Sequence, residues 1–244
     1  MLLWGITGSG KTEVYLQLAE QELAAGRHVL ILTPEIGLIP QLVDRCRRRF
    51  GSRVLEYHSG CRDRERLQVW RRCLAPEQPL LVVGTRSAVF IPLSPLGLVV
   101  LDEEHDSSYK QAAPMPCYHA RDLALDRIRA GGGRLVLGSA TPSLDSWVQL
   151  HPDGPLHLGR LTQRISQQSL PPVHVVDMRH ELAEGHRRLI SRPLMDRVAE
   201  LPEKGEQAVI LVPRRGYSPF LGCRSCGEVV MCPNCDVALT VHRG

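Results

Sequence analysis

The sequence predicts an α/β fold with a mostly parallel sheet, and three observations lead to this prediction. Short runs of valine, leucine and isoleucine recur over residues 1–145, each long enough for one buried strand. Amphipathic helical patterns separate these runs. A glycine-rich loop joins the first run to the first helical pattern. Aliphatic strands without polar alternation, separated by helices, are typical of a parallel sheet that is covered on both faces.

The expected elements follow one another at regular intervals. Strands are predicted at Leu2–Ile6, His28–Leu32, Val54–Tyr57, Leu80–Gly84, Leu98–Leu101 and Leu135–Gly138. Helices are predicted at about Thr12–Ala25 and Leu38–Phe50, and around Leu67, Trp70 and Leu74. Gly26 is a suitable C-terminal stop for the first helix. In the second helix, apolar side chains recur at four-residue steps and form one buried face.

The pattern changes after Trp147. Four prolines lie within residues 151–172, which predicts a linker. A strand at Val173–Asp177, a helix around Pro193–Leu201 and a strand at Gln207–Val212 then open a second α/β unit. The expected organisation is a first lobe over 1–150, a linker over 151–172, the start of a second lobe over 173–222 and a cysteine module over 223–244. Two strands do not make a stable sheet, and Met1 falls inside the first strand, so we expect a partial copy.

Composition excludes several classes of protein. The 244 residues are 43% hydrophobic and 23% charged, with a formal net charge of +4, which is typical of a globular chain and not of a disordered one. No apolar run approaches the ~18 residues that span a bilayer. The N-terminus lacks the features of a signal peptide. Half of the eight cysteines crowd into one short segment, which favours a cytoplasmic protein with a metal site over a disulfide framework.

The loop GITGSGKT at residues 5–12 matches the phosphate-binding pattern G-x-x-x-x-G-K-[ST] in full. Its glycines let backbone N–H groups surround a phosphate, and the following helix adds its positive end. Lys11 can reach the outer phosphates, and the Thr12 hydroxyl can bind magnesium. A chance glycine and serine turn is the alternative, but a strand before the loop and a helix after it argue against that. The predicted nucleotide-binding residues are Gly5, Thr7, Gly8, Ser9, Gly10, Lys11 and Thr12, together with Asp102.

The aliphatic run after Gly97 ends abruptly in Asp102, Glu103, Glu104 and His105. Adjacent carboxylates repel one another, and they are stabilised at a strand end when a cation lies between them. We expect Asp102 to hold magnesium and Glu103 to orient or deprotonate an attacking water. His105 would sense the nucleotide. A solvated acidic turn is the alternative, and the phosphate loop upstream makes the functional interpretation the stronger one.

Several further segments carry a resemblance to a known family. They include LTPEIGL (32–38), VVGTRSAVFIPL (82–93), LVVLDEEHDSSYKQ (98–111), LGSATPSLDS (137–146) and LVPRRGYSPFLGCRSCG (211–227). With the phosphate loop, these segments resemble superfamily 2 helicases, and more closely the primosomal replication-restart helicases. The resemblance implies a RecA-like lobe, then the start of a second RecA-like lobe with a cysteine insertion that binds zinc. It also implies ATP-dependent 3′ to 5′ DNA unwinding in primosome assembly and in the restart of stalled forks.

The resemblance also implies roles for individual residues. ATP and Mg²⁺ are the implied ligands, and the implied catalytic set is Lys11, Asp102, Glu103 and His105. Single-stranded and forked DNA would be bound by Thr33, Glu35, Thr85, Arg86, Ser87, Tyr109, Lys110 and Tyr118. Ser139 and Thr141 would link hydrolysis to DNA movement, although Ser139–Thr141 could also be an ordinary helix start. Other primosome proteins and single-strand-binding proteins are implied partners. A run of arginines, Arg45 and Arg47–Arg49, is expected to be a solvated helix face, with DNA as the alternative.

Four cysteines form two C-x-x-C pairs, Cys223 with Cys226 and Cys232 with Cys235, separated by five residues. This pattern is typical of thiolate ligands for zinc. All four could share one zinc. The resemblance instead implies that each pair is half of a site completed by cysteines further along a longer chain, and the short spacing favours this second interpretation.

Three interpretations of function follow. The chain is an ATP-driven DNA motor, a nucleotide-binding or zinc-stabilised interaction protein that does not translocate, or an inactive helicase fragment. The segments DEEHDSSYKQ and SAT favour the motor. In a motor of this class a second lobe supplies an arginine finger. Residues 1–244 alone are therefore expected to bind ATP weakly, with negligible turnover even in the presence of single-stranded DNA.

Overall fold

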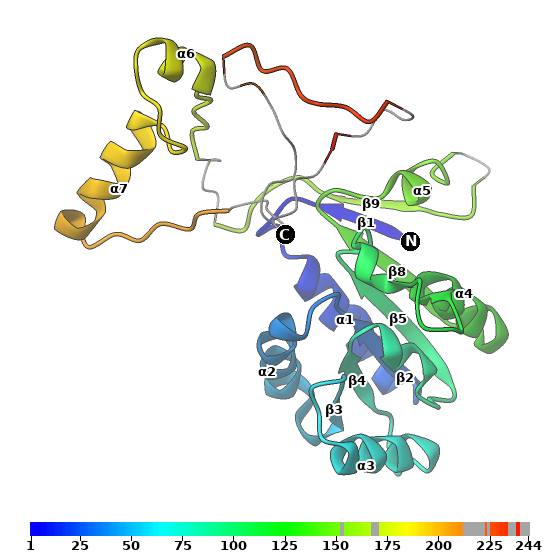
Figure 1. Ribbon diagram of the computed structural model, residues 1–244. Helices are drawn as coiled ribbons and strands as arrows, with labels where there is room; N and C mark the ends of the chain where they lie inside the picture. The colour runs from blue at the N-terminus through cyan, green and yellow to red at the C-terminus, as the bar shows by residue number, and fades with distance from the viewer. Residues whose placement is uncertain (152–153, 167–170, 212–222, 224, 234–237, 240–244) are drawn as a thin grey trace. The chain divides into compact units, whose positions relative to one another are not determined.

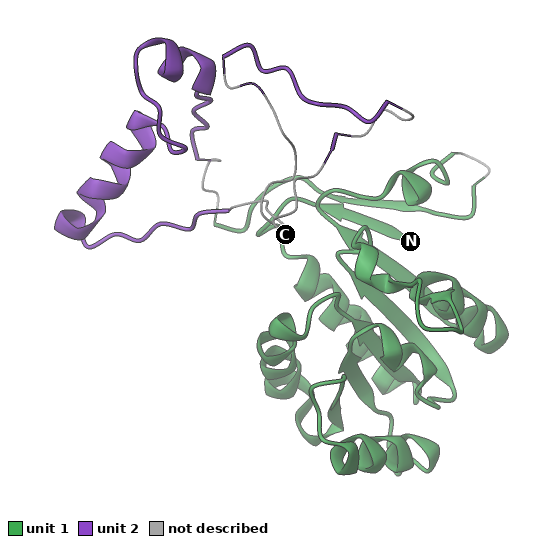
Figure 2. Ribbon diagram, viewed as in Figure 1, with its two compact units in different colours: residues 1–169 green, residues 170–244 purple. Residues whose placement is uncertain are grey.

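A computed structural model describes residues 1–151, 154–166, 171–211, 223, 225–233 and 238–239. The chain divides into two units, Met1–Ser169 and Leu170–Gly244 (Figure 2). Each unit is described by itself below. No helix in the described part of the chain is both long enough and apolar enough to cross a membrane.

A seven-stranded parallel sheet is the centre of the first unit (Figure 1). Its strand order is β3-β4-β2-β5-β8-β1-β9. The strands are β1 (Leu2–Gly5), β2 (His28–Leu32), β3 (Val54–Tyr57), β4 (Leu81–Gly84), β5 (Leu96–Asp102), β8 (Arg134–Ser139) and β9 (Leu158–Leu161). The six predicted strands are confirmed to within a few residues at their ends, and every pairing is parallel.

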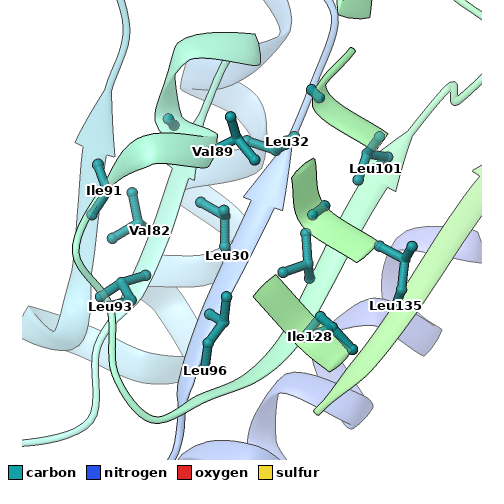
Figure 3. Close-up of a cluster of buried hydrophobic side chains, with 14 of the residues drawn as sticks. Leu30, Leu32, Val82, Val89, Ile91, Leu93, Leu96, Leu101, Ile128 and Leu135 are labelled. Carbon is teal, nitrogen blue, oxygen red and sulfur yellow. The ribbon is translucent and has the colours of Figure 1, made fainter. Parts of the chain in front are cut away.

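Helices cover both faces of this sheet. On one face lie α1 (Lys11–Ala24) and α2 (Ile39–Phe50), and on the other lie α3 (Asp63–Leu74) and α4 (Ala120–Gly131). Along β2, Val29 and Ile31 contribute to the first core cluster, while Leu30 and Leu32 contribute to the second. Figure 3 shows part of the second cluster, with Leu30 and Leu32 among the side chains of the neighbouring elements. The core strands carry aliphatic residues without alternation because both of their faces are buried.

Strand β9 lies within the segment that the sequence predicts to be a linker, so that prediction is wrong for residues 158–161. Leu158 and Leu161 pair with Leu2 and Gly5 of β1 and extend the sheet at its edge. The four residues of β9 are only half-buried or exposed. An edge strand this short gives a weak hydrophobic signal, and the nearby prolines conceal it.

Shorter elements complete the first unit. A two-stranded antiparallel ribbon pairs β6 (Lys110–Gln111) with β7 (Tyr118–His119), and α5 (Leu144–Trp147) is a single turn. Short 3-10 turns span Ile36–Leu38, Gly51–Arg53, Arg86–Phe90 and Ser107–Tyr109.

The second unit contains α6 (Met178–Ala183) and α7 (Arg192–Lys204), and α7 confirms the predicted helix. Glu181 joins the two helices by accepting a hydrogen bond from the backbone N–H of Arg192 at 2.8 Å and one from its guanidinium at 3.1 Å. The strand predicted at Val173–Asp177 is absent, and Val173 and Val175 are 84% and 92% exposed. Residues 207–211 are not a strand either, and position 212 lies outside the described residues. The apolar residues at both places fit a strand pattern, but within the described part of the chain no strand pairs with them.

Candidate nucleotide site

The phosphate loop borders a cavity of about 820 Å³ at the carboxyl ends of β1 and β5. The lining residues include Ile6, Thr7, Gly8, Ser9, Gly10, Lys11, Thr12, Asp102 and Glu103. Gly8 and Gly10 have φ angles of 80° and 91°, in the left-handed region that favours glycine. Gly10 directly precedes α1, so the N-terminal N–H groups of this helix meet the cavity. The structure therefore brings the predicted phosphate loop and the acidic strand end into one site.

Lys11 lies inside this site, with its side chain only 11% exposed. Its Nζ donates a hydrogen bond to the carbonyl oxygen of Gly5 at 2.9 Å and lies 4.0 Å from Oε1 of Glu103. Glu103 has a φ of 48°, an unusual backbone conformation for a residue other than glycine, and such strained positions cluster at functional sites. Ser9 Oγ is buried and has no hydrogen-bond partner among the described residues. An anion in the loop would satisfy both the ammonium and this hydroxyl.

Asp102 ends β5 and is held at both its side chain and its backbone. The hydroxyl of Tyr15 donates a hydrogen bond to Asp102 Oδ1 at 2.9 Å. The Tyr109 hydroxyl lies 2.7 Å from the backbone oxygen of Asp102 and 2.9 Å from that of Leu32. Burial raises the pKa of the Asp102 carboxyl, and the hydrogen bond from Tyr15 opposes that rise. Asp102 and Thr12 also line a second, smaller cavity of about 140 Å³, so the two expected magnesium ligands border the same space.

The next residues connect this strand end to the SAT segment. His105 Nδ1 lies 2.8 Å from Oγ of Ser139, which also accepts a hydrogen bond from the backbone N–H of Thr141 at 3.0 Å. Glu104 is 2% exposed and accepts hydrogen bonds from Ser143 N, Ser143 Oγ and Ser146 Oγ at 2.7, 3.0 and 2.8 Å. The structure thus joins the acidic turn to Ser139 and Thr141 by direct contacts. No role for Glu104 is predicted from the acidic run, although the two serines at 143 and 146 that contact it are three residues apart in the sequence.

The arginine run of α2 is more than a solvated face. Arg45, Arg48 and Arg49 line the nucleotide cavity, at the i, i+3 and i+4 spacing that places side chains on one side of a helix. Arg49 forms ion pairs with Glu13 at 2.8 Å and Glu20 at 2.6 Å. The lining of the cavity therefore contains three arginines as well as the carboxylates of Asp102 and Glu103.

The predicted DNA contacts fall into two groups. Glu35 and Lys110 are exposed, and Thr85, Ser87 and Tyr118 are partly buried. Tyr109 and Thr33 are 0% and 1% exposed, so the expectation that they contact DNA is corrected. The enclosed ring of Tyr109 has no free face on which a base could stack, and the Thr33 side chain does not reach the outer surface. Tyr109 instead supports the backbone of Asp102, and Thr33 lines the smaller cavity.

Arg86, another of the expected DNA contacts, has several partners within the fold. Its guanidinium donates to the backbone oxygens of Ser108 and Lys110, both at 3.0 Å, and to Oε1 of Gln111 at 3.1 Å. It also lies 5.7 Å from the centre of the Tyr118 ring. Arg86 thereby ties the GTRSA segment to the ribbon of β6 and β7.

The cysteine cluster is described only in part, because Cys235 lies outside the described residues. Cys223 and Cys226 are exposed, and the turn between them is closed by a hydrogen bond from Gly227 N to Cys223 O at 2.8 Å. Backbone and side-chain hydrogen bonds from Cys226 lower the pKa of the Cys223 thiol. The side-chain hydrogen bond between Cys226 and Cys223 brings two thiols together, as a pair of zinc ligands requires.

A different group, Glu56, His58 and Cys61, brings three potential metal ligands within 4.8 Å of one another in the described part of the chain. Both ring nitrogens of His58 are already engaged. Its Nδ1 accepts a hydrogen bond from Gly60 N at 3.0 Å, and its Nε2 lies 2.8 Å from Glu56 Oε1. These contacts stabilise the turn after β3 and leave no ring nitrogen for a cation.

The strand order, the phosphate loop after β1 and the acidic end of β5 define a class: the first unit is a RecA-like lobe that carries a P-loop nucleotide site. Residues 1–149 match the family model described as DEAD/DEAH box helicase. The chain belongs to the DEAD/DEAH box helicase family. Its fold is similar to that of the Pyrococcus furiosus Hef helicase domain, with a TM-score of 0.51 and 21% identity over 84% of this chain and 44% of that one.

Two curated relatives are similar to the chain over nearly all of its length. The Replication restart protein PriA of Synechocystis sp. is 51% identical over 99% of this chain and 29% of its own length. The Replication restart protein PriA of Bacillus subtilis is 47% identical over 99% of this chain and 30% of its own length. The chain thus spans less than a third of these relatives. The resemblance seen in the sequence is confirmed, and the matched part of each relative is its helicase region.

Proposed function

We propose that the chain binds Mg-ATP in the 820 Å³ cavity as the nucleotide-binding lobe of an ATP-dependent DNA helicase of the replication-restart type. One observation carries the proposal: Lys11, the glycine loop and the carboxylates of Asp102 and Glu103 line the same cavity. A cation facing two carboxylates across a loop of backbone N–H groups fits a triphosphate bound with a divalent metal ion.

The residues present fit this ligand. Ser9 Oγ is buried and has no hydrogen-bond partner in the part of the chain that the structure describes. A Cβ at Gly8 would meet no atom within 4 Å, so the loop has free space at this glycine. Thr12 and Asp102 would hold the magnesium ion, which neutralises phosphate charge when it is bound. Lys11 would bind the outer phosphates, and Glu103 would orient the attacking water and take up its proton. His105 would couple nucleotide binding to the position of Ser139 through the 2.8 Å contact between His105 Nδ1 and Ser139 Oγ.

DNA would bind along the loops that Arg86 ties together. Lys110 supplies an exposed positive charge, and Glu35, Thr85, Ser87 and Tyr118 supply polar or aromatic contacts. The names of the two PriA relatives support replication restart as the process. Unwinding from 3′ to 5′, action on forked DNA, and contacts with primosome and single-strand-binding proteins belong to the same proposal, as does a cytoplasmic location. The alternative is a nucleotide-binding module, with or without zinc, that does not act on DNA.

Linkage between the two ligands tests the proposal against this alternative. We expect Mg-ATP to change the affinity for a fluorescein-labelled single-stranded oligonucleotide by about fivefold or more, the lower end of typical coupling between sites. Fluorescence anisotropy at fixed salt measures this change. Lys110→Ala should weaken oligonucleotide binding, whereas Lys204→Ala removes the same charge from α7 and serves as the control. Identical anisotropy curves with and without Mg-ATP would support the alternative.

We also propose that zinc binds the cysteine pairs as two half-sites. The turn at Cys223 and Cys226 supplies two thiolates, and a structural zinc site needs four ligands. The purified chain should therefore retain well under one equivalent of zinc after dialysis against a mild chelator, because a half-site gains only part of the binding free energy of a closed one. Elemental analysis measures the content, with Cys117→Ser as the control outside the cluster. One full equivalent retained by a monomer would instead show that all four cysteines share one zinc.

A further inference from the structure

A tyrosine on α1 meets the carboxylate at the end of β5. Tyr15 lies one helical turn after Lys11, so both side chains occupy the same side of α1. It is 1% exposed, and its hydroxyl donates to Asp102 Oδ1 at 2.9 Å. Burial, followed by the charge of Asp102, raises the pKa of Tyr15 well above its usual range. The hydroxyl donates and the carboxylate oxygen accepts, so the contact links α1 directly to the end of β5.

The strand next to β5 leaves room for this hydroxyl. A Cβ at Gly138 of β8 would overlap the Tyr15 oxygen and would come within 2.7 Å of Cζ of the ring. Any side chain at this position would push the hydroxyl away from Asp102. Gly138 pairs with Asp102 across β5 and β8, so the glycine lies directly beside the carboxylate that the tyrosine contacts. Three elements thus converge on a single hydrogen bond.

This hydrogen bond constrains Asp102 more than packing alone would. Tyr109 already fixes the backbone oxygen of Asp102, and Tyr15 fixes Oδ1. A carboxylate has two oxygens, so with Oδ1 engaged the other oxygen stays available for a cation in the cavity. Hydrogen bonds of this kind orient carboxylate ligands of metal ions, and losing one typically weakens metal binding 10- to 100-fold.

We propose that Tyr15 is a positioning residue that holds Asp102 in the orientation needed to bind the magnesium ion of a bound nucleotide, and that Gly138 provides the space for it. The inference rests on the proposed Mg-ATP site. It concerns metal binding rather than phosphate binding: Tyr15 is absent from the lining of the cavity, so its effect must pass through Asp102.

The test is the magnesium dependence of nucleotide binding by the full chain. A fluorescent ATP analogue is held at fixed concentration while Mg²⁺ is titrated. Tyr15→Phe keeps the buried ring and removes only the hydroxyl, and we expect the half-saturating Mg²⁺ concentration to rise about tenfold. Tyr57→Phe is the matched control, since Tyr57 is also buried and its hydroxyl contacts Arg66 at 3.4 Å. Its half-saturating Mg²⁺ concentration should equal that of the wild type.

A second variant moves the hydroxyl without deleting it. Gly138→Ala should also raise the Mg²⁺ requirement, because the new methyl group displaces the ring from Asp102. An unchanged Mg²⁺ requirement in Tyr15→Phe, with only a lower melting temperature, would show that Tyr15 merely fills the core. A lower requirement would also overturn the inference, since the hydrogen bond would then compete with the metal. If the wild-type chain binds no analogue at all, the proposed function fails together with this inference.

Discussion

Lys11→Ala should abolish detectable ATP binding. The Lys11 ammonium is the charge that the loop directs into the cavity, and its side chain is only 11% exposed. A hydrogen bond between charged groups in such a place contributes up to about 3 kcal/mol, which corresponds to a loss of affinity of more than 100-fold. The affinity for ATP falls further because the carboxylates of Glu103 and Asp102 would then repel the phosphates without the opposing charge of the lysine. Isothermal titration calorimetry with Mg-ATP measures the change.

Lys204→Ala is the matched control for this measurement. It removes the same charge, but Lys204 pairs with Glu200 at 2.6 Å on α7 and is not among the residues that line the cavity. The affinity of the Lys204→Ala variant for Mg-ATP should stay within about twofold of that of the wild type, because an exposed ion pair contributes little to the stability of the fold. Equal affinities for Lys11→Ala and the wild type would contradict the assignment of the phosphate site.

Much of this site could be predicted from the sequence because local patterns encode it. The loop at residues 5–12 needs glycines at fixed positions, and the acidic residues follow a continuous aliphatic run. The carboxyl ends of parallel strands share one edge of a sheet, so the loop after β1 and the acids after β5 had to meet. The same reasoning could not locate β9, a four-residue strand at the edge of the sheet that pairs with β1 and places Leu158 and Leu161 against the core.

Contacts between residues distant in the sequence account for the other differences between the predicted and the observed roles of side chains. Tyr109 and Thr33 were expected at DNA, yet burial is a property of the folded chain that no local pattern expresses. The sequence places Arg86 at DNA, but it does not indicate the partners of Arg86 within the fold, which lie 22–25 residues further along the chain. No local pattern indicates a role for Tyr15, because its partner, Asp102, is 87 residues away in the chain. In each case the residue type alone predicts one role, whereas the actual contacts of the side chain depend on residues that are distant in the sequence.

The second prediction concerns Glu104, whose contacts join two segments about 40 residues apart in the chain. Glu104→Ala should lower the free energy of unfolding by roughly 3 kcal/mol. The substitution leaves Ser143 N, Ser143 Oγ and Ser146 Oγ without their acceptor, and hydrogen bonds to a charged group contribute about 1.5–3 kcal/mol each without being additive. For a chain of this size the melting temperature should fall by about 6–12 °C. Differential scanning calorimetry measures this fall.

Two further variants separate the hydrogen-bond network from the mere loss of a carboxylate. Glu20→Ala makes the same substitution at an exposed ion pair with Arg49, where both side chains meet water, and should cost about 1 kcal/mol or less. Glu104→Gln keeps one carbonyl acceptor and should fall between the wild type and Glu104→Ala. Ser143 and Ser146 lie at the turn of α5, which ends at Trp147. Loss of their hydrogen bonds to Glu104 should therefore also release Trp147 from its edge contact with Trp4, in which the ring centres are 5.7 Å apart. The tryptophan fluorescence of Glu104→Ala should then differ from that of the wild type below the melting temperature. If Glu104→Ala and Glu20→Ala melt at the same temperature, the buried network contributes nothing to the stability of the lobe, and the acidic turn must be held by the strand alone.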